Sequence, residues 1–405
     1  MGRSRNEPGV STRPPLPRNV WVLGFVSLLM DLSSEIYHAL LPAFVTIVLG
    51  LPVTALGAID GVAEATANFG KLVSGRLSDR SLRRKPWVVG GYGLAALSKP
   101  LFPLATSAAT VMLARFADRI GKGIRGAPRD ALVADLTPAS VRGAAFGLRQ
   151  ALDSVGAVAG PLLAVVLIGY FAGNFRAAFW VAVVPAFVCV ALLVFGVQEK
   201  DERAHPPPTA KRVSWRDVRR LDHRFYIVTA IASVLTLARF SEAFLVLRGQ
   251  DVGMGNTGAP WVMVAMSLVY AAFAFPAGRL ADRGHATSLL SAGLAALVAS
   301  DVVLGLAGGA AGAIAGASLW GLHMALTQGL LAALVAATAP PDLRGSAFGV
   351  YNLASGVALL IASALAGYLW QSAGPAATFF AGAAITVVAW IALSAYASRV
   401  PRLDS

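Results

Sequence analysis

Long apolar stretches separated by short polar segments make up most of the chain, beginning at about Val20. A helix that crosses the hydrocarbon core of a bilayer needs roughly 20 mostly apolar residues. The pattern therefore predicts an all-α polytopic membrane protein with twelve transmembrane helices. The predicted helices cover residues 20–48, 55–76, 86–105, 108–130, 144–169, 175–197, 225–248, 259–277, 287–307, 311–337, 347–370 and 376–397.

One polar stretch, residues 198–224, is much longer than the other interruptions. It contains Pro206-Pro207-Pro208 and eight basic residues, and it separates six apolar stretches from six. The pattern predicts a polar tail, a six-helix bundle, a linker, a second six-helix bundle and a short second tail. Their expected limits are 1–18, 19–197, 198–224, 225–397 and 398–405.

The chain is strongly basic, with 34 Lys and Arg against 21 Asp and Glu and a formal charge of +13. Charged residues are nevertheless only 14% of the chain, against about 25% in soluble proteins. Membrane proteins collect Lys and Arg on the cytoplasmic side. With both termini cytoplasmic, the tails, linker and inner loops hold 23 basic residues, and the outer loops hold only Arg176 and Arg248. We expect a multi-pass protein of the cell (inner) membrane with both termini cytoplasmic and no nucleic-acid partner.

The two halves of the chain repeat each other at an offset of 202 or 203 residues. The recurring segments are GRLSDR at 75–80 and GRLADR at 278–283, and RGAAFG at 142–147 and RGSAFG at 344–349. A weaker repeat, Ser34-Glu35 and Ser241-Glu242, has an offset of 207. Two six-helix repeats around a central cavity are typical of membrane transporters. The repeats therefore predict two pseudo-symmetric bundles.

The first recurring segment resembles a known signature. Gly75-x-x-x-Asp79-Arg80, followed by a basic cluster, resembles the best-known motif of the major facilitator superfamily. The resemblance covers essentially the whole chain and implies the major facilitator fold. It also implies a cytoplasmic gate in which aspartate and arginine tie the two halves together. The gate residues that it implies are Gly75, Asp79, Arg80, Asp282 and Arg283.

Two further segments resemble signatures of the same family. Arg119-x-x-Lys122-Gly123 resembles an Arg-x-x-Gln-Gly motif, with lysine in place of glutamine. Gly156-x-x-x-Gly160-Pro161 resembles a motif that the family associates with exporters that exchange substrate for protons. The residues themselves also fit a simpler hypothesis, a site of close helix packing with a proline kink.

Nine basic and nine acidic residues fall in the membrane region, most of them in the first half, when Arg76, Arg176 and Arg248 at the helix ends are assigned to the loops. Charges in hydrocarbon are costly, so they face the interior or form pairs. Near the cytoplasmic end we expect a structural ion-pair network, in which Arg149 and Asp153 have the spacing of a contact within one helix. Its members are Arg125, Arg129, Asp130, Arg149 and Asp153.

A second set of charges should lie near half depth, where transporter sites are found. Asp31, Glu35 and His38 share one face of the first helix. We expect Asp31 and Glu35 to couple transport to protons, because a desolvated carboxylate can load and release a proton as the cavity switches sides. The expected substrate or coupling cations are Arg115, Arg119 and Lys122, and the candidate cavity-lining residues are His38, Glu64, Asn68, Arg239 and Glu242.

The leading hypothesis is a monomeric secondary transporter that exports a small solute in exchange for protons. An alternative is uptake or exchange of an anionic solute, bound by the Arg and Lys stripe of the fourth helix. A remote alternative is a membrane receptor that transports nothing. A phosphate-binding Gly-x-x-x-x-Gly-Lys loop does not occur, and one cysteine with five histidines makes a metal site a poor fit. We expect no enzymatic activity, no metal and no cofactor beyond a proton gradient.

Overall fold

The computed structural model describes residues 15–79, 81, 83–138, 141–199, 221–338 and 344–397, all of them in helices or their connections. The first half contains α1 (Arg18–Ala43) with the π-helical turn η1 (Phe44–Val48), α2 (Val53–Asp79), α3 (Lys85–Ser98), α4 (Leu101–Leu104), α5 (Ala108–Asp135), α6 (Arg142–Tyr170) and α7 (Phe175–Gly196). The second half contains α9 (His223–Ala238), α10 (Ala243–Asp251), α11 (Gly255–Gly258), α12 (Trp261–Leu280), the π-helical turn η3 (Ala281–His285), α13 (Ala286–Leu306), α14 (Ala310–Ala337), α15 (Arg344–Ala373) and α16 (Pro375–Ala397). The predicted tails and most of the predicted linker lie outside the described residues.

Nine helical segments of the described chain are long and apolar enough to cross a membrane. The remaining three crossings are α2, α3 with α4, and α5. They are not long and apolar enough to be recognised in this way, because they contain buried charges or a break. Asp60 and Glu64 lie within α2, and α3 ends at Ser98, two residues before Pro100. The chain is therefore an all-α polytopic membrane protein with twelve crossings, as the apolar pattern predicts.

Two predicted helices are interrupted, which the apolar pattern did not show. The stretch 86–105 breaks at Lys99 and Pro100, because proline has no backbone N–H to donate. The stretch 225–248 breaks between α9 and α10. At this break Arg239 leaves the helical conformation, with φ −100° and ψ 73°, and Ser241 Oγ accepts a hydrogen bond from the N–H of Ala243. We call residues 239–242 the α9–α10 break.

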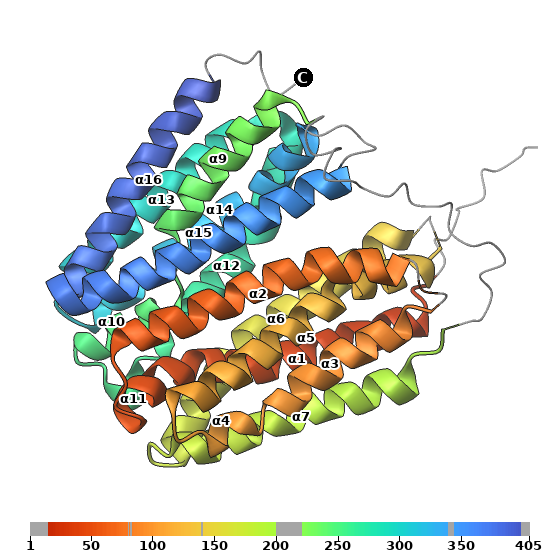
Figure 1. Cartoon of the computed structure of the whole chain (residues 1–405), viewed down its shortest axis with the longest axis horizontal. Helices are drawn as coiled ribbons and strands as arrows, with labels where there is room; N and C mark the ends of the chain where they lie inside the picture. Colours follow the sequence, from red (N-terminus) through yellow and green to blue (C-terminus); the bar gives the residue numbers. More distant parts are fainter. Residues whose placement is uncertain are drawn as a thin grey trace, which may run out of the picture.

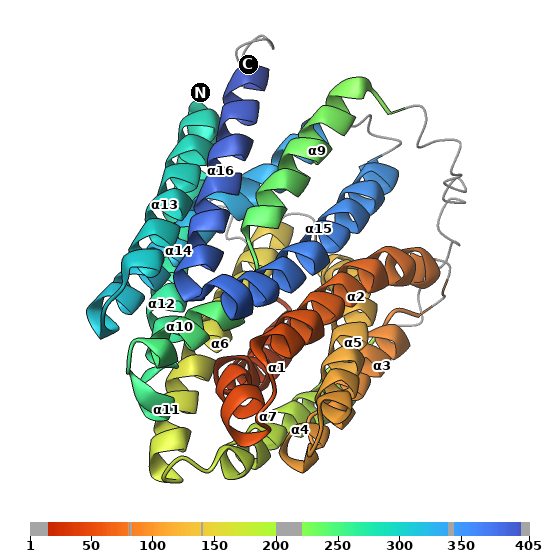
Figure 2. The same ribbon diagram turned by 60° about the vertical axis from the view of Figure 1, so that its left-hand side comes forward.

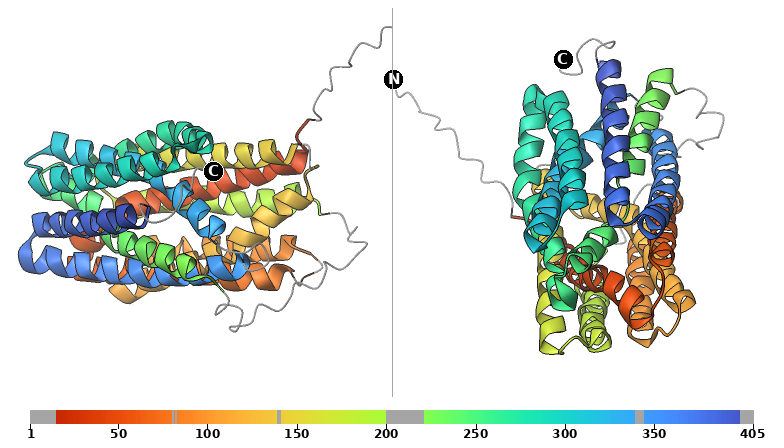
Figure 3. Two further views of the ribbon diagram at one scale, coloured as in Figure 1. Left: turned by 90° about the horizontal axis from the view of Figure 1, so that it is seen from above. Right: turned by 90° about the vertical axis from the view of Figure 1, so that its left-hand side faces the viewer.

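The helices form two bundles, α1 to α7 and α9 to α16, which lie side by side (Figure 1). The chain passes from one bundle to the other between the end of α7 and the start of α9; we call this side the linker end and the opposite side the far end. The bundles converge toward the far end and their helices diverge toward the linker end (Figures 1 and 2). Seen from above, each bundle keeps its helices roughly along one common direction (Figure 3).

Small residues allow the two bundles to approach closely where α2 packs against α15. A Cβ on Gly61 would lie 3.1 Å from the carbonyl oxygen of Leu360, and a Cβ on Gly367 would lie 3.0 Å from Cα of Thr54. Glycine permits such backbone contact between membrane helices, where packing replaces the hydrophobic effect as the driving force. The α2–α15 contact therefore joins the bundles over the half of α2 that is nearer the far end.

This geometry predicts a position-dependent cross-link between the bundles. In a Cys189→Ser background, we expect Thr54→Cys with Gln371→Cys to form a disulfide on oxidation, because Thr54 Oγ1 lies 3.4 Å from Gln371 Oε1. Val73→Cys with Phe348→Cys is the matched control. These two positions continue the antiparallel register of α2 and α15, but toward the ends that diverge. Gel mobility after proteolysis between the halves reports both yields, and equal yields would contradict the arrangement.

Candidate functional site

Asp60 is bound from both halves of the molecule. Its Oδ1 accepts hydrogen bonds of 3.1 and 2.7 Å from Nε and Nη2 of Arg115 on α5. Its Oδ2 accepts a hydrogen bond of 2.8 Å from Oγ of Ser241 in the α9–α10 break. The Asp60 and Arg115 side chains are 2% and 3% exposed. Both carboxylate oxygens are therefore satisfied, and one of the bonds crosses between the bundles.

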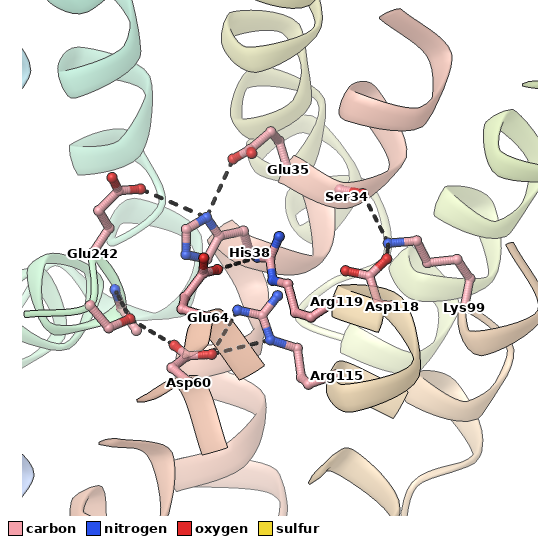
Figure 4. Close-up of polar contacts among 12 residues, drawn as sticks. Ser34, Glu35, His38, Asp60, Glu64, Lys99, Arg115, Asp118, Arg119 and Glu242 are labelled. Atoms are coloured by element: carbon pink, nitrogen blue, oxygen red, sulfur yellow. Dashed lines mark hydrogen bonds and ion pairs between the residues drawn. The ribbon is translucent and has the colours of Figure 1, made fainter. Parts of the chain in front are cut away.

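His38 on α1 lies between two carboxylates, one from each half (Figure 4). Its Nδ1 is 3.4 Å from Oε2 of Glu35, one turn earlier on α1, and 3.9 Å from Oε2 of Glu242 in the α9–α10 break. These side chains are only partly buried, with 13% of His38 exposed. The weak repeat of Ser34-Glu35 as Ser241-Glu242 thus brings two equivalent glutamates to one imidazole.

Arg119 and Lys122 on α5 behave differently. Arg119 Nη2 lies 2.9 Å from Oε1 of Glu64 on α2, and its Nε, although buried, has no hydrogen-bond partner. Lys122 makes no ion pair or hydrogen bond with any residue that the structure describes. It acts electrostatically on Glu35, Glu64 and Asp31. Lys122 is therefore an available cation beside the central carboxylates.

The Lys99–Asp118 ion pair joins the end of α3 to α5 next to these residues. Lys99 Nζ donates to Asp118 Oδ1 at 2.9 Å and to Ser34 Oγ at 3.0 Å, and the Lys99 side chain is 1% exposed. Tyr37 Oη donates to the backbone oxygens of Lys99 and Phe179, at 3.2 and 2.8 Å. The break at Lys99 and Pro100 places this ammonium group against α1.

Asp31 shares a helix face with Glu35, one turn away, but most of the charges that act on the two carboxylates differ. The charged groups that act on Asp31 are those of α5 and α6, namely Asp153, Arg125, Lys122 and Arg129. Close to this group, Arg149 Nη1 donates to Asp153 Oδ2 at 2.6 Å, so the predicted contact within one helix is confirmed. The two carboxylates expected to couple protons thus occupy two neighbouring clusters, with Lys122 acting on both.

The glycines of α6 determine how α1 presents these two carboxylates. A Cβ on Gly156 would lie 3.0 Å from Cβ of Asp31, and a Cβ on Gly160 would lie 3.3 Å from Cα of Glu35. The Gly156-x-x-x-Gly160-Pro161 segment is therefore a close-packing site, as the residue-based hypothesis holds. Because it packs directly behind Asp31 and Glu35, close packing and a role in coupling are compatible.

The other predicted site residues are placed as follows. Asn68 on α2 faces Gly356 of α15, where a Cβ would lie 3.5 Å from Cβ of Asn68. Arg239 lies in the α9–α10 break with its buried Nε unpartnered, and it forms no ion pair of up to 4 Å with Glu242 in the described structure. Gly75 and Asp79 lie in the last turns of α2 and Asp282 lies in η3, but nothing of their side chains is described, and Arg80 lies outside the described residues. Arg283 is exposed. The gate therefore stays a prediction.

Sequence reasoning did not select Asp60, Lys99, Asp118 or Ser241 as site residues. Asp60 precedes Glu64 by one helical turn, and Asp118 immediately precedes Arg119, so each is adjacent to a residue that was selected. The helical stripes on α2 and α5 are the signal that could have found them. What the stripes do not specify is which partner each charge meets on the neighbouring helix.

Twelve crossings in two bundles that meet around buried, paired charges define a membrane transporter of the secondary type, not an enzyme. The family model "Major Facilitator Superfamily" matches residues 23–248 and 240–405. The chain belongs to this superfamily, as its motifs predict.

Three known proteins illustrate the relationship. An uncharacterized MFS-type transporter of Methanocaldococcus jannaschii is 32% identical over 387 residues, covering 93% of this chain and 94% of the relative. Multidrug resistance protein MdtH of Photorhabdus laumondii is 27% identical over 340 residues, covering 82% and 79%. A crystal structure of a POT family transporter in complex with 5-aminolevulinic acid superimposes with a TM-score of 0.81 at 14% identity, covering 95% and 96%. This last similarity concerns the fold alone.

The Lys99–Asp118 pair gives a stability prediction. Lys99→Ala leaves the Asp118 carboxylate buried without its cation, which typically costs about 3–5 kcal/mol. We expect a large fall in the melting temperature of the purified protein in detergent. The double variant Lys99→Met with Asp118→Leu should recover most of the loss, because an apolar pair removes both charges. Asp222→Asn, at the exposed start of α9, is the control and should leave the melting temperature unchanged. A single variant as stable as the double variant would contradict the pairing.

Proposed function

We propose that the protein exports a small solute in exchange for protons across the cell membrane, with both termini in the cytoplasm. The observation on which this rests is His38, held between Glu35 of one half and Glu242 of the other. Imidazole and carboxylate groups both exchange protons under physiological conditions when their surroundings change. A proton can therefore alter a contact that joins the two halves.

The exchange follows from the charges at this contact. When both glutamates are ionised and His38 is protonated, the imidazolium attracts Glu35 and Glu242 together, which favours joined bundles. A proton on Glu242 removes its attraction to His38 and frees the α9–α10 break. The proton thus binds with different free energies to the joined and the separated arrangements of the bundles. Alternating access requires this difference, because a ligand shifts a conformational equilibrium only through its differential affinity for the two states.

Asp31 extends the proposed path toward the linker end. It lies one helical turn from Glu35, and Lys122 acts on both carboxylates. While no solute is bound, the positive charges of Lys122 and Arg119 would compensate the negative charges of Asp31, Glu35 and Glu64. A proton or a cationic solute that binds these carboxylates neutralises part of their negative charge. Solute and proton therefore compete for the same carboxylates.

Two further facts support export. The relative named multidrug resistance protein MdtH matches over most of both chains. The Gly156-x-x-x-Gly160-Pro161 segment, which resembles the signature of proton-exchanging exporters, packs behind Asp31 and Glu35. We further propose that the protein acts as a monomer and that Asp79, Arg80, Asp282 and Arg283 close the cytoplasmic side.

A second candidate function is exchange or uptake of an anionic solute. It is favoured by unused cationic groups on α5. Lys122 has no hydrogen bond or ion pair in the described structure, and Arg119 Nε and Arg125 Nη1 are buried without hydrogen-bond partners. Lys122 and Arg119 lie one helical turn apart on α5, so one anion could contact both of them.

Transport in proteoliposomes with an imposed pH gradient separates these functions. We would screen cationic and anionic solutes, beginning with ethidium and fluorescein, while recording the internal pH. For export, Asp31→Asn and Glu35→Gln should abolish uphill transport but leave solute counterflow intact, because only the proton step is removed. Anion exchange predicts that Arg119→Ala loses more transport activity than Asp31→Asn or Glu35→Gln.

The matched control is Asp222→Asn, a carboxylate at the start of α9 that is 57% exposed and lies outside the central contact. It should keep both activities. If Glu35→Gln retains full proton-driven transport, the proposed coupling is wrong. If none of the screened solutes is transported and none of them causes proton release, the proposal of proton-coupled export is wrong.

A further inference from the structure

Asp301, on α13 in the second half, is a carboxyl group without a partner. Its exposed fraction is 0%. Neither Oδ1 nor Oδ2 has a hydrogen-bond partner in the structure. An ionised carboxylate in such surroundings is costly, since transferring an isolated charge from water to an apolar medium is far less favourable than transferring a neutral polar group. This physical cost distinguishes Asp301 from the paired carboxylates of the first half.

The surroundings of Asp301 are aromatic and apolar. A Cβ on Gly382 of α16 would lie 2.7 Å from Asp301 Oδ2 and 3.1 Å from Cε1 of Phe240, so the carboxyl group and the ring meet at one point of α16. The Phe240 ring in turn contacts Trp320 and Phe379, with ring centroids 5.3 and 5.6 Å away. The Asp301 carboxyl group thus lies beside the Phe240 ring, which belongs to an aromatic cluster of the second half.

The charged groups on the neighbouring elements are occupied elsewhere or distant. On α14, His323 Nδ1 is 2.8 Å from the backbone oxygen of Gly293, and its buried Nε2 has no partner among the described residues, Asp301 included. On α10, Arg248 donates to the backbone oxygens at the end of α13 and pairs with Asp251. Arg239 of the α9–α10 break forms no ion pair with Asp301 in the described structure. Helix α16 has no charged residue, and the charges of η3 lie about 24 Å away along α13. No described cation is in place to stabilise an ionised Asp301.

We propose that Asp301 is a second proton-binding site, that it holds a proton in this conformation, and that Phe240 closes it off from the central site. Phe240 is one of the four residues of the α9–α10 break, and its neighbours in sequence are Arg239 and Ser241. A rearrangement of the break that displaces the ring opens Asp301 toward Arg239, whose buried Nε is unpartnered. Asp301 then ionises beside a cation and releases its proton.

This inference goes beyond the coupling role proposed for Glu35 and Glu242. It assigns proton binding to the half that holds few of the membrane charges, and it does not depend on the direction of transport. The protonated state of Asp301 is a property of the resting protein, so it can be tested without a substrate.

Infrared difference spectroscopy of the purified protein in lipid nanodiscs measures the carbonyl stretch of a protonated carboxylic acid. We expect the wild-type protein to keep such a band at pH 8, and Asp301→Asn to lose it. Glu64→Gln is the matched control, because it removes a carboxyl group of the first half that pairs with Arg119 and not with the α9–α10 break; it should keep the Asp301 band. Phe240→Ala opens the site to water, so its band should disappear at a lower pH than in the wild-type protein.

Three results would overturn the inference. An absent band in the wild-type protein at pH 8, or an unchanged band in Asp301→Asn, shows that Asp301 holds no proton. A band that titrates identically in Phe240→Ala and wild-type protein shows that Phe240 does not close the site. Should Asp301→Asn fail to fold, the wild-type band and its shift in Phe240→Ala decide the outcome. Loss of proton-driven transport in Glu35→Gln leaves every one of these results unchanged, so the two proposals fail separately.

Discussion

Charges buried within a membrane must find partners, and this constraint shapes the first half of the molecule. Asp60, Asp118 and Glu64 are each paired with a cation of a neighbouring helix. Breaking such a pair strands a charge in a medium that solvates it poorly. Helices α2 and α5 carry most of these charges and are not among the nine segments that are long and apolar enough to cross a membrane. The same charges that lower the hydropathy of α2 and α5 hold them together.

The α9–α10 break connects this network to the second half. Ser241 binds Asp60, and Glu242 approaches His38, so adjacent residues of the break reach two helices of the first bundle. Phe240, the preceding residue, instead turns into the second bundle and packs on Trp320. A displacement of the break therefore acts on both halves at once. Its position at the interface makes it a natural element for alternating access.

Much of the fold was accessible from the sequence. Twelve apolar stretches and two repeats predicted the crossings, the resemblance of the Gly75-x-x-x-Asp79-Arg80 segment to a signature implied the family, and the four-residue spacing predicted the Arg149–Asp153 pair. The breaks were not predicted, because the stretch that contains Arg239 and Glu242 stays apolar overall. Helical spacing placed Asp31 and Glu35 on one face, yet the packing of α6 and α5 separates their surroundings. Periodicity fixes the face of a helix, whereas the partner depends on the rotation and proximity of its neighbours.

The central claim is that protonation of the contact among Glu35, His38 and Glu242 controls how the two bundles meet. Spin labels on Leu77 of α2 and Phe275 of α12, both exposed, would report the separation of the bundles near the linker end by pulsed electron resonance in nanodiscs. We predict that the distance distribution shifts between two populations as the pH changes, and that Glu242→Gln abolishes this shift. A distribution that is independent of pH, or one that shifts equally in Glu242→Gln, would contradict the account.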